Sequence, residues 1–154
     1  PLLLDAVDQW QRISPVEKGR FNYAGLFDTY RSSISSFIDG SLRADNLLLL
    51  DQLMVTFDEL PEVPLCLTHH DLHLGNLCGH EKRLTVLDWE YAGFGNPWFD
   101  AACLNSKFNI PISAIGALPA FRFLQQRSLE QGMTNAVRLI NVLEQLWLAV
   151  RANH

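Results

Sequence analysis

Three polar side chains near the middle of the chain have the residue types and spacing of a catalytic site. Asp71 lies in the run His69-His70-Asp71-Leu72-His73-Leu74-Gly75-Asn76, so that Asn76 follows it within the same loop. Asp88 comes directly after the apolar segment Leu84-Thr85-Val86-Leu87. Carboxylate and amide oxygens are the ligands that Mg²⁺ prefers, and a carboxylate can also orient a hydroxyl group and accept its proton. Together these residues predict metal-assisted chemistry on a phosphate.

Phosphoryl transfer assigns a separate task to each of the three side chains. The pattern His-x-Asp-Leu-x-x-x-Asn is typical of the catalytic loop of kinase-like phosphotransferases. In that chemistry Asp71 is the expected catalytic base for an alcohol, and Asn76 and Asp88 are the expected Mg²⁺ ligands beside the phosphates of ATP. Catalysis would then come mostly from positioning and charge neutralisation.

The elements around this loop are predicted from hydrophobic periodicity and turn residues. Apolar residues recur at helical spacing from 23 to 37 and again from 47 to 57, with Asp45 or Asn46 as the expected cap of the second helix and Pro61 after its end. Segment 65–68 suits a short buried strand. Residues 76–78 and 84–87 suit a β-hairpin.

The remaining third of the chain returns to helical patterns. Segment 91–98 contains two glycines, Asn96 and Pro97, and is expected to be a loop. Helix is expected from Asp100 onward with breaks at Pro111 and Pro119, and a last amphipathic helix is expected around 139–150.

The stretch from 65 to 104 resembles the aminoglycoside phosphotransferase and choline kinase superfamily. The resemblance rests on the loop 67–76, on Leu87-Asp88-Trp89-Glu90-Tyr91-Ala92-Gly93 and on Asn96-Pro97-Trp98-Phe99-Asp100, which are most similar to bacterial thiamine kinases and choline kinases. It implies an α+β fold, the mainly α-helical C-terminal lobe of a protein-kinase-like fold, with a small β-hairpin carrying the active-site loop. It also implies that His69 and Asp100 support the loop by hydrogen bonds.

The same resemblance suggests where the acceptor binds. It implies that Glu90 lies near the acceptor, and Trp89, Tyr91 and Trp98 could form an aromatic cage for a cation such as a quaternary ammonium or thiazolium. Packing in the core is the alternative for these rings, and Trp10 and Trp147 are assigned to packing. His70 departs from the family pattern, and its side chain is expected to point away from the site.

A smaller lobe that covers the ATP phosphates is expected in this superfamily, and no segment of the chain matches its glycine-rich loop or its strand lysine. Residues 1–154 are therefore interpreted as the C-terminal catalytic and substrate lobe alone, without the N-terminal ATP lobe. Such a lobe by itself is expected to turn over weakly or not at all.

Two other classes of function remain open at this stage. His69, His70, Asp71 and His73 crowd together as ligands do in zinc hydrolases, although such a site would need a distant ligand such as His80 or His154. A kinase-like lobe could also be kept as a non-catalytic binding module.

Composition argues against some classes of binding partner and location. The chain is 48% hydrophobic and 19% charged with a formal net charge of −5, and it has no basic stripe for nucleic acid. No apolar run reaches the length of a membrane span. The three cysteines show no metal or disulfide spacing, which favours a reducing cytoplasm. The expected partner is a small, cationic alcohol: thiamine, choline, ethanolamine or an aminoglycoside.

Overall fold

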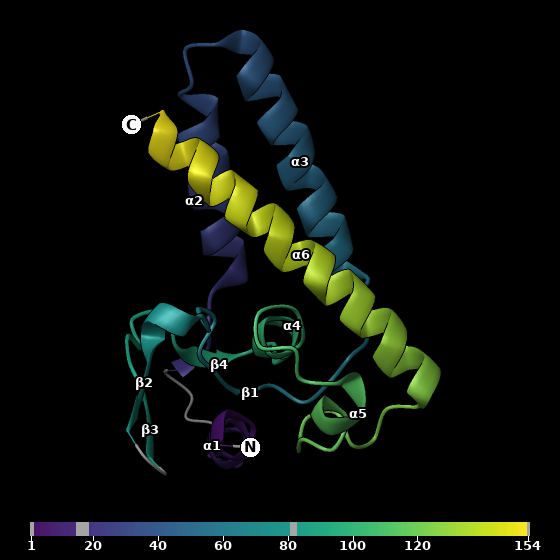
Figure 1. Ribbon diagram of the computed structural model, residues 1–154. Helices are drawn as coiled ribbons and strands as arrows, with labels where there is room; N and C mark the ends of the chain where they lie inside the picture. The colour runs from purple at the N-terminus through teal and green to yellow at the C-terminus, as the bar shows by residue number, and fades with distance from the viewer. Residues whose placement is uncertain (1, 15–18, 81–82, 154) are drawn as a thin grey trace.

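The computed structural model describes residues 2–14, 19–80 and 83–153, and it combines long helices with two small antiparallel sheets (Figure 1). The helices are α1 (Leu2–Gln11), α2 (Tyr23–Ser35), α3 (Gly40–Asp58), the 3₁₀ turn η2 (Leu74–Asn76), α4 (Trp98–Ser106), α5 (Ile112–Ile115) and α6 (Gln126–Ala152). The strands are β1 (Cys66–Thr68), β2 (Leu77–His80), β3 (Arg83–Val86) and β4 (Gly93–Gly95). This mixed, mainly helical architecture is the predicted fold class.

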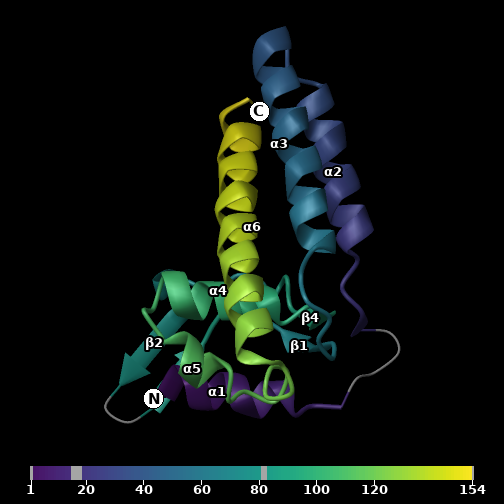
Figure 2. The ribbon, with the colours of Figure 1, turned by 90° about the vertical axis from the view of Figure 1, so that its right-hand side faces the viewer.

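Three long helices form one half of the molecule. Helix α3 packs against both α2 and α6, and α6 also packs against α4. The three stand side by side in Figure 2, above the strands and the shorter helices. Buried apolar residues hold this half together, among them Ile34 on α2, Leu50 on α3 and Leu139 on α6. Their burial provides the hydrophobic stabilisation that fixes the helices relative to the site below them.

The boundaries of these helices differ from the sequence expectation. Helix α3 begins at Gly40, before the expected caps at Asp45 and Asn46. The reason is that the side chain of Asp39 accepts hydrogen bonds from Ser41 N at 2.8 Å and Leu42 N at 2.9 Å, and so satisfies the first free amides of the helix.

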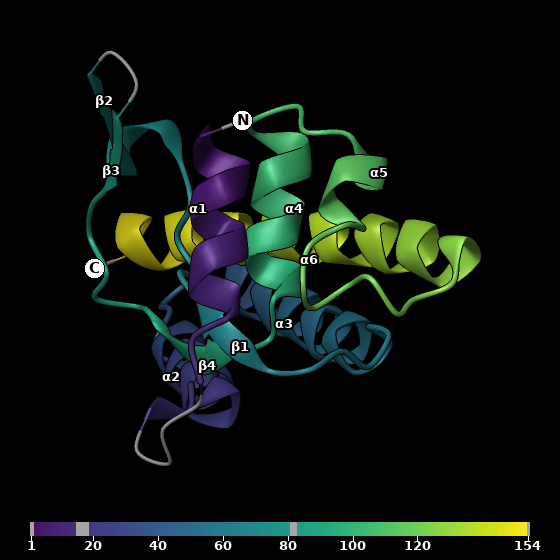
Figure 3. The same cartoon turned by 90° about the horizontal axis from the view of Figure 1, so that it is seen from below.

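Two pairs of short strands hold residues 69–76 between them; this is the loop predicted to be catalytic, and it is called the catalytic loop below. Strand β1 pairs antiparallel with β4, with Leu67 opposite Phe94, and β2 pairs antiparallel with β3. Segment 91–98 was expected to be a loop, and β4 within it was missed, because Gly93-Phe94-Gly95 has the composition of a turn and becomes a strand only by pairing with β1. Figure 3 shows the β2–β3 hairpin extending to one side of α1.

The last helices complete the framework around the site. Helix α4 begins at Trp98, and Asp100 lies in its first turn. Helix α6 is much longer than the apolar pattern indicated and runs from Gln126 to Ala152. Within the described ranges, no helix combines the length and the apolar character needed to cross a bilayer.

Candidate active site

The backbone of the catalytic loop is held by one buried carboxylate. Asp100 accepts hydrogen bonds from the amide of His69 at 2.9 Å and from the amide of His70 at 3.0 Å, one on each oxygen. Only 1% of Asp100 is exposed, and this burial raises the pKa of its carboxyl group, while the two amide hydrogen bonds oppose the rise. The expected supporting role of Asp100 therefore has a geometric basis.

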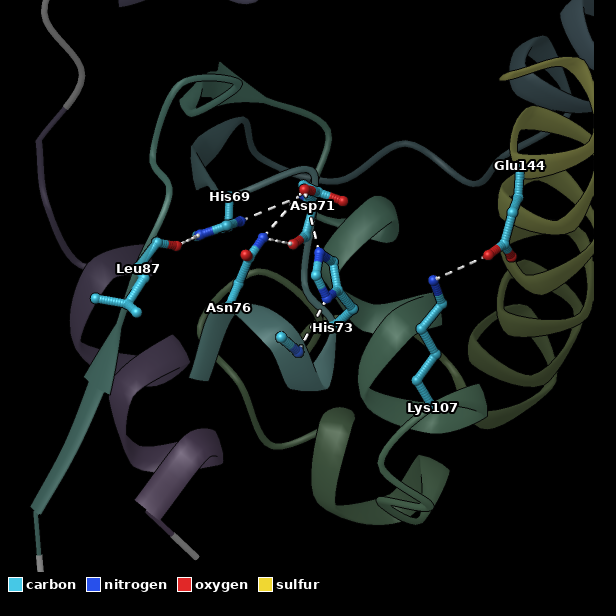
Figure 4. A network of polar contacts seen from close by, with 8 residues as sticks. His69, Asp71, His73, Asn76, Leu87, Lys107 and Glu144 are labelled. Carbon is cyan, nitrogen blue, oxygen red and sulfur yellow. Dashed lines mark hydrogen bonds and ion pairs between the residues drawn. The ribbon is translucent and has the colours of Figure 1, made fainter. Parts of the chain in front are cut away.

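The imidazole of His69 connects the catalytic loop to the segment that carries Asp88. Its Nδ1 accepts from the Asp71 amide at 3.3 Å, and its Nε2 donates to the carbonyl of Leu87 at 2.9 Å (Figure 4). This arrangement assigns the proton to Nε2. His69 is completely buried, so these contacts are shielded from water. It supports both acidic residues through the backbone.

Asp71 and Asn76 lie in direct contact across the loop. The side-chain amide of Asn76 donates to the Asp71 carbonyl and to Asp71 Oδ2, both at 3.0 Å (Figure 4). His73 Nε2 lies 3.5 Å from the same oxygen, while its Nδ1 accepts from the Gly75 amide at 3.0 Å. The Asp71 side chain keeps 41% exposure, so one oxygen is oriented by neighbours while the carboxylate still reaches the surface.

Asp88 is brought toward Asn76 by the hairpin. The amide of Leu87 donates to the carbonyl of Asn76 at 2.8 Å, so Asp88 directly follows a residue whose backbone is bonded to that of Asn76. Asp88 adopts a left-handed backbone with φ of 58°, a conformation that is uncommon outside glycine and favoured by Asp and Asn. Such a turn redirects the side chain immediately after the strand.

The donor set fits a hard divalent cation. Both hydrogens of the Asn76 amide point to Asp71, and within the described residues no hydrogen bond occupies its Oδ1. An amide oxygen and the exposed carboxylate of Asp88 are ligands of the kind that Mg²⁺ takes. Their metal-binding role stays a prediction.

A cavity of about 610 Å³ opens beside Asp71. Its acidic wall includes Asp71, Glu90 and Glu144, and Lys107 Nζ lies 3.9 Å from Glu144 Oε1 (Figure 4). Its apolar wall carries aromatic rings that come from separate parts of the chain: Phe21, Tyr30, Tyr91, Phe99 and Trp147. The cavity combines carboxylates with aromatic faces next to the predicted base.

The three aromatic residues expected to form a cage are not brought together. Tyr91 lines the cavity, and the charge of Glu90 beside it raises the pKa of the Tyr91 hydroxyl. Trp89 instead packs edge-on against Trp10, with ring centroids 5.2 Å apart. Trp98 has no exposed surface, and its indole nitrogen donates to the carbonyl of Pro61 at 2.9 Å. Packing therefore accounts for Trp98, whereas Trp89 rests on Trp10, stays 39% exposed and does not line the cavity.

Two other residues lie in the cavity wall contrary to expectation. Trp147 was assigned to packing, yet it is 44% exposed and lines the cavity from α6, one turn beyond Glu144. His70 was expected to point away, and its ring instead forms part of the same wall. The i, i+3 spacing of Glu144 and Trp147 on one helix face was the only local signal for the first of these.

The histidines do not form the zinc site considered as an alternative. In the part of the chain that the structure describes, no three His, Cys, Asp or Glu side chains converge as metal ligands. Both ring nitrogens of His69 are engaged in hydrogen bonds, and Nδ1 of His73 is engaged by a backbone amide. His154 lies outside the described residues.

Comparison with known proteins agrees with the fold and with the predicted family. Residues 5–148 match the model of the "Phosphotransferase enzyme family". A segment of 90 residues, 54% of this chain, is 32% identical to Protein LicA of Haemophilus influenzae and spans 33% of that protein.

A solved structure shares the architecture across almost the whole chain. The choline/ethanolamine kinase family protein of Mesorhizobium loti superimposes with a TM-score of 0.69 at 18% identity, covering 99% of this chain and 53% of that one. This chain thus spans one third of the length of LicA and about half of the solved protein. Since the family match covers most of the chain, the chain belongs to the phosphotransferase enzyme family.

Proposed function

We propose that the chain is the C-terminal catalytic lobe of an ATP-dependent kinase that phosphorylates the hydroxyl group of a small cationic alcohol. The observation that carries the proposal is the cavity in which Asp71 lies beside carboxylates and aromatic rings. The family match supports phosphoryl transfer, and the neighbouring solved protein belongs to a choline/ethanolamine kinase family. Nucleotide and acceptor are both part of the proposal.

Asp71 is the proposed base. The acceptor oxygen forms a new bond to the γ-phosphorus of ATP, the bond from that phosphorus to the bridging oxygen breaks, and ADP leaves. The hydroxyl proton passes to the Asp71 carboxylate. Asn76 and His73 lie on Asp71 Oδ2, so that Oδ1 can face the acceptor.

Asn76 and Asp88 are the proposed Mg²⁺ ligands. The metal would neutralise charge on the phosphates when the nucleotide is bound. His69 and Asp100 hold the proposed base and the proposed metal ligands in place. Their hydrogen bonds fix the backbone of the loop beside Asp71 and the backbone of Leu87 beside Asp88.

The acceptor is proposed to be a cation because of what surrounds Asp71. Glu90 and Glu144 contribute negative charge, and the rings of Tyr91 and Trp147 offer π-faces that attract ammonium groups, with one face of Trp147 covered by the Arg151 guanidinium 4.6 Å from the ring centroid. Lys107 offsets part of this charge from the edge of the cavity. Choline, ethanolamine, thiamine and an aminoglycoside all combine a positive charge with a hydroxyl group.

The test is ADP release by the intact protein with Mg²⁺ and ATP against choline, ethanolamine, thiamine, homoserine and an aminoglycoside. Acceptor-dependent release that Asp71→Asn lowers by about 10²-fold or more, with nucleotide affinity retained, supports the proposal. His80→Asn, on the exposed hairpin, is the control variant. If no acceptor gives ADP release and the protein binds no nucleotide, the result would instead favour a non-catalytic binding module.

A further inference from the structure

The ring of His70 makes one short polar contact, and that contact leads to another part of the chain. Its Nε2 lies 2.6 Å from the hydroxyl oxygen of Tyr23, and the amide of Asn96 donates to the same hydroxyl oxygen at 2.6 Å. Because the oxygen already accepts from Asn96, we assign the hydroxyl proton to the contact with His70. The ring therefore accepts at Nε2 and carries its own proton on Nδ1.

The aromatic surroundings keep this imidazole neutral. Its ring stacks on Phe21 with centroids 4.1 Å apart and meets Tyr23 and Phe99 at an angle. This burial lowers the pKa of His70 to about 4. A neutral ring can accept the hydrogen bond from the Tyr23 hydroxyl group at every pH near neutrality.

The surroundings of His70 carry two unfavourable features. Its Nδ1 is buried and makes no hydrogen bond of good geometry within the described residues, although the backbone of Thr68 and Tyr91 acts to raise the pKa of the ring. The backbone of His70 is also left-handed, with φ of 66°. Strained and unsatisfied groups of this kind are concentrated at functional sites.

The bond joins two walls of the acceptor cavity. Tyr23 begins α2, and Leu26 and Tyr30 on the same helix line the cavity, while His70 directly precedes Asp71. The close approach depends on Gly95, because a Cβ there would lie 2.7 Å from His70 Nε2 and would also meet the Tyr23 hydroxyl group. The amide of Phe21 donates to the Phe94 carbonyl at 3.1 Å, so the segment before α2 is attached to β4 as well.

We propose that the hydrogen bond from Tyr23 to His70 is a positioning element that sets Asp71 relative to the acceptor wall formed by α2. This inference rests on the proposed function, since it assigns a role around the proposed base. Tyr23 and His70 are positioning residues: they act on the acceptor hydroxyl group only through the placement of Asp71 and of α2.

The test compares Tyr23→Phe and His70→Asn in the intact protein. Asn tolerates the left-handed backbone but is too short to reach Tyr23, so each variant removes the Tyr23–His70 bond from one side. Tyr23→Phe in addition removes the acceptor of the Asn96 amide. Ile34→Val, buried near the other end of α2, is the control for a small loss of packing.

Both variants should lower kcat for acceptor phosphorylation by about tenfold or more, because small misplacements of a catalytic group are costly. The KM for ATP should stay within about twofold of wild type, and Ile34→Val should keep its kcat. The double variant should be no more than about threefold worse than Tyr23→Phe, because that substitution already removes the Tyr23–His70 bond together with the Asn96 contact. A kcat equal to that of Ile34→Val, or fully additive losses, overturns the proposal.

Hydrogen exchange provides a readout that does not need turnover. The amides of 69–76 should exchange faster in Tyr23→Phe and His70→Asn than in wild type or Ile34→Val. If the wild-type protein phosphorylates no acceptor, the proposed function fails. The hydrogen-exchange comparison then tests by itself whether the Tyr23–His70 hydrogen bond is a positioning element. Unchanged protection of the loop in both variants then overturns it.

Discussion

Replacing His70 with Asn should make the stability of the protein less sensitive to mild acid. Burial among Phe21, Tyr23 and Phe99 lowers the pKa of His70 from 6.5 to about 4, because the charged ring would lose its hydration. The unfolded chain therefore binds a proton that the folded protein does not bind. Stability is fully present above pH 6.5 and is lost as the pH falls from there toward 4.

The magnitude follows from the width of that window. Between about pH 7 and pH 5, this one imidazole should cost about 2 kcal/mol of folding free energy. His70→Asn removes the titration and also loses the hydrogen bond to Tyr23, a loss of about 1 kcal/mol that does not depend on pH. The raised pKa of Asp100 acts in the opposite direction, but it is present in both proteins and cancels in the comparison.

Urea unfolding at the two pH values measures the effect. Wild type should lose about 2 kcal/mol more than His70→Asn between about pH 7 and pH 5. His80→Asn, which removes a histidine from the exposed end of β2, controls for the loss of an imidazole. Equal losses in wild type and His70→Asn would show that the ring is not kept neutral by burial, and would refute the reasoning.

Three further changes test other parts of the site and the fold. Asp88→Ala should weaken Mg²⁺–ATP binding by about tenfold or more, with Asp45→Ala on α3 as control; normal nucleotide affinity by calorimetry would contradict its metal role. Trp147→Leu should raise the acceptor KM by about five- to tenfold and leave the ATP KM unchanged, because a π-face is lost; an unchanged acceptor KM would remove Trp147 from the acceptor site. Gly132→Ala should lower stability by about 1–3 kcal/mol, because the added Cβ meets the fully buried ring of Trp98; a more stable variant would mean that helix propensity outweighs this clash.

The central residues of the site could be predicted from the sequence because their relation is local. Asp71 and Asn76 lie within one loop, and Asp88 follows a hairpin whose two strands have a clear pattern. Short-range geometry brings such residues together whatever the rest of the fold does. The bracing contact of Asp100 spans more of the chain, and it was expected from family resemblance rather than from spacing.

The cavity that we propose for the acceptor was decided by tertiary structure. Tyr30, Lys107 and Trp147 come from α2, the end of α4 and α6, and no local pattern distinguishes them from ordinary helix surface or core. Trp89 and Trp98 lie next to the site in sequence, yet packing takes both rings away from the cavity.

His70 shows the same division within a single residue. Its neighbours in sequence placed it in the catalytic loop, but the direction of its ring depends on a left-handed backbone and on the hydroxyl group of Tyr23. Local spacing therefore determined which side chains the loop brings together. Which side chains share the cavity was decided only by the packing of α2, α4 and α6 around the loop. Those contacts join segments that are far apart in the chain, and no local sequence pattern links one segment to another.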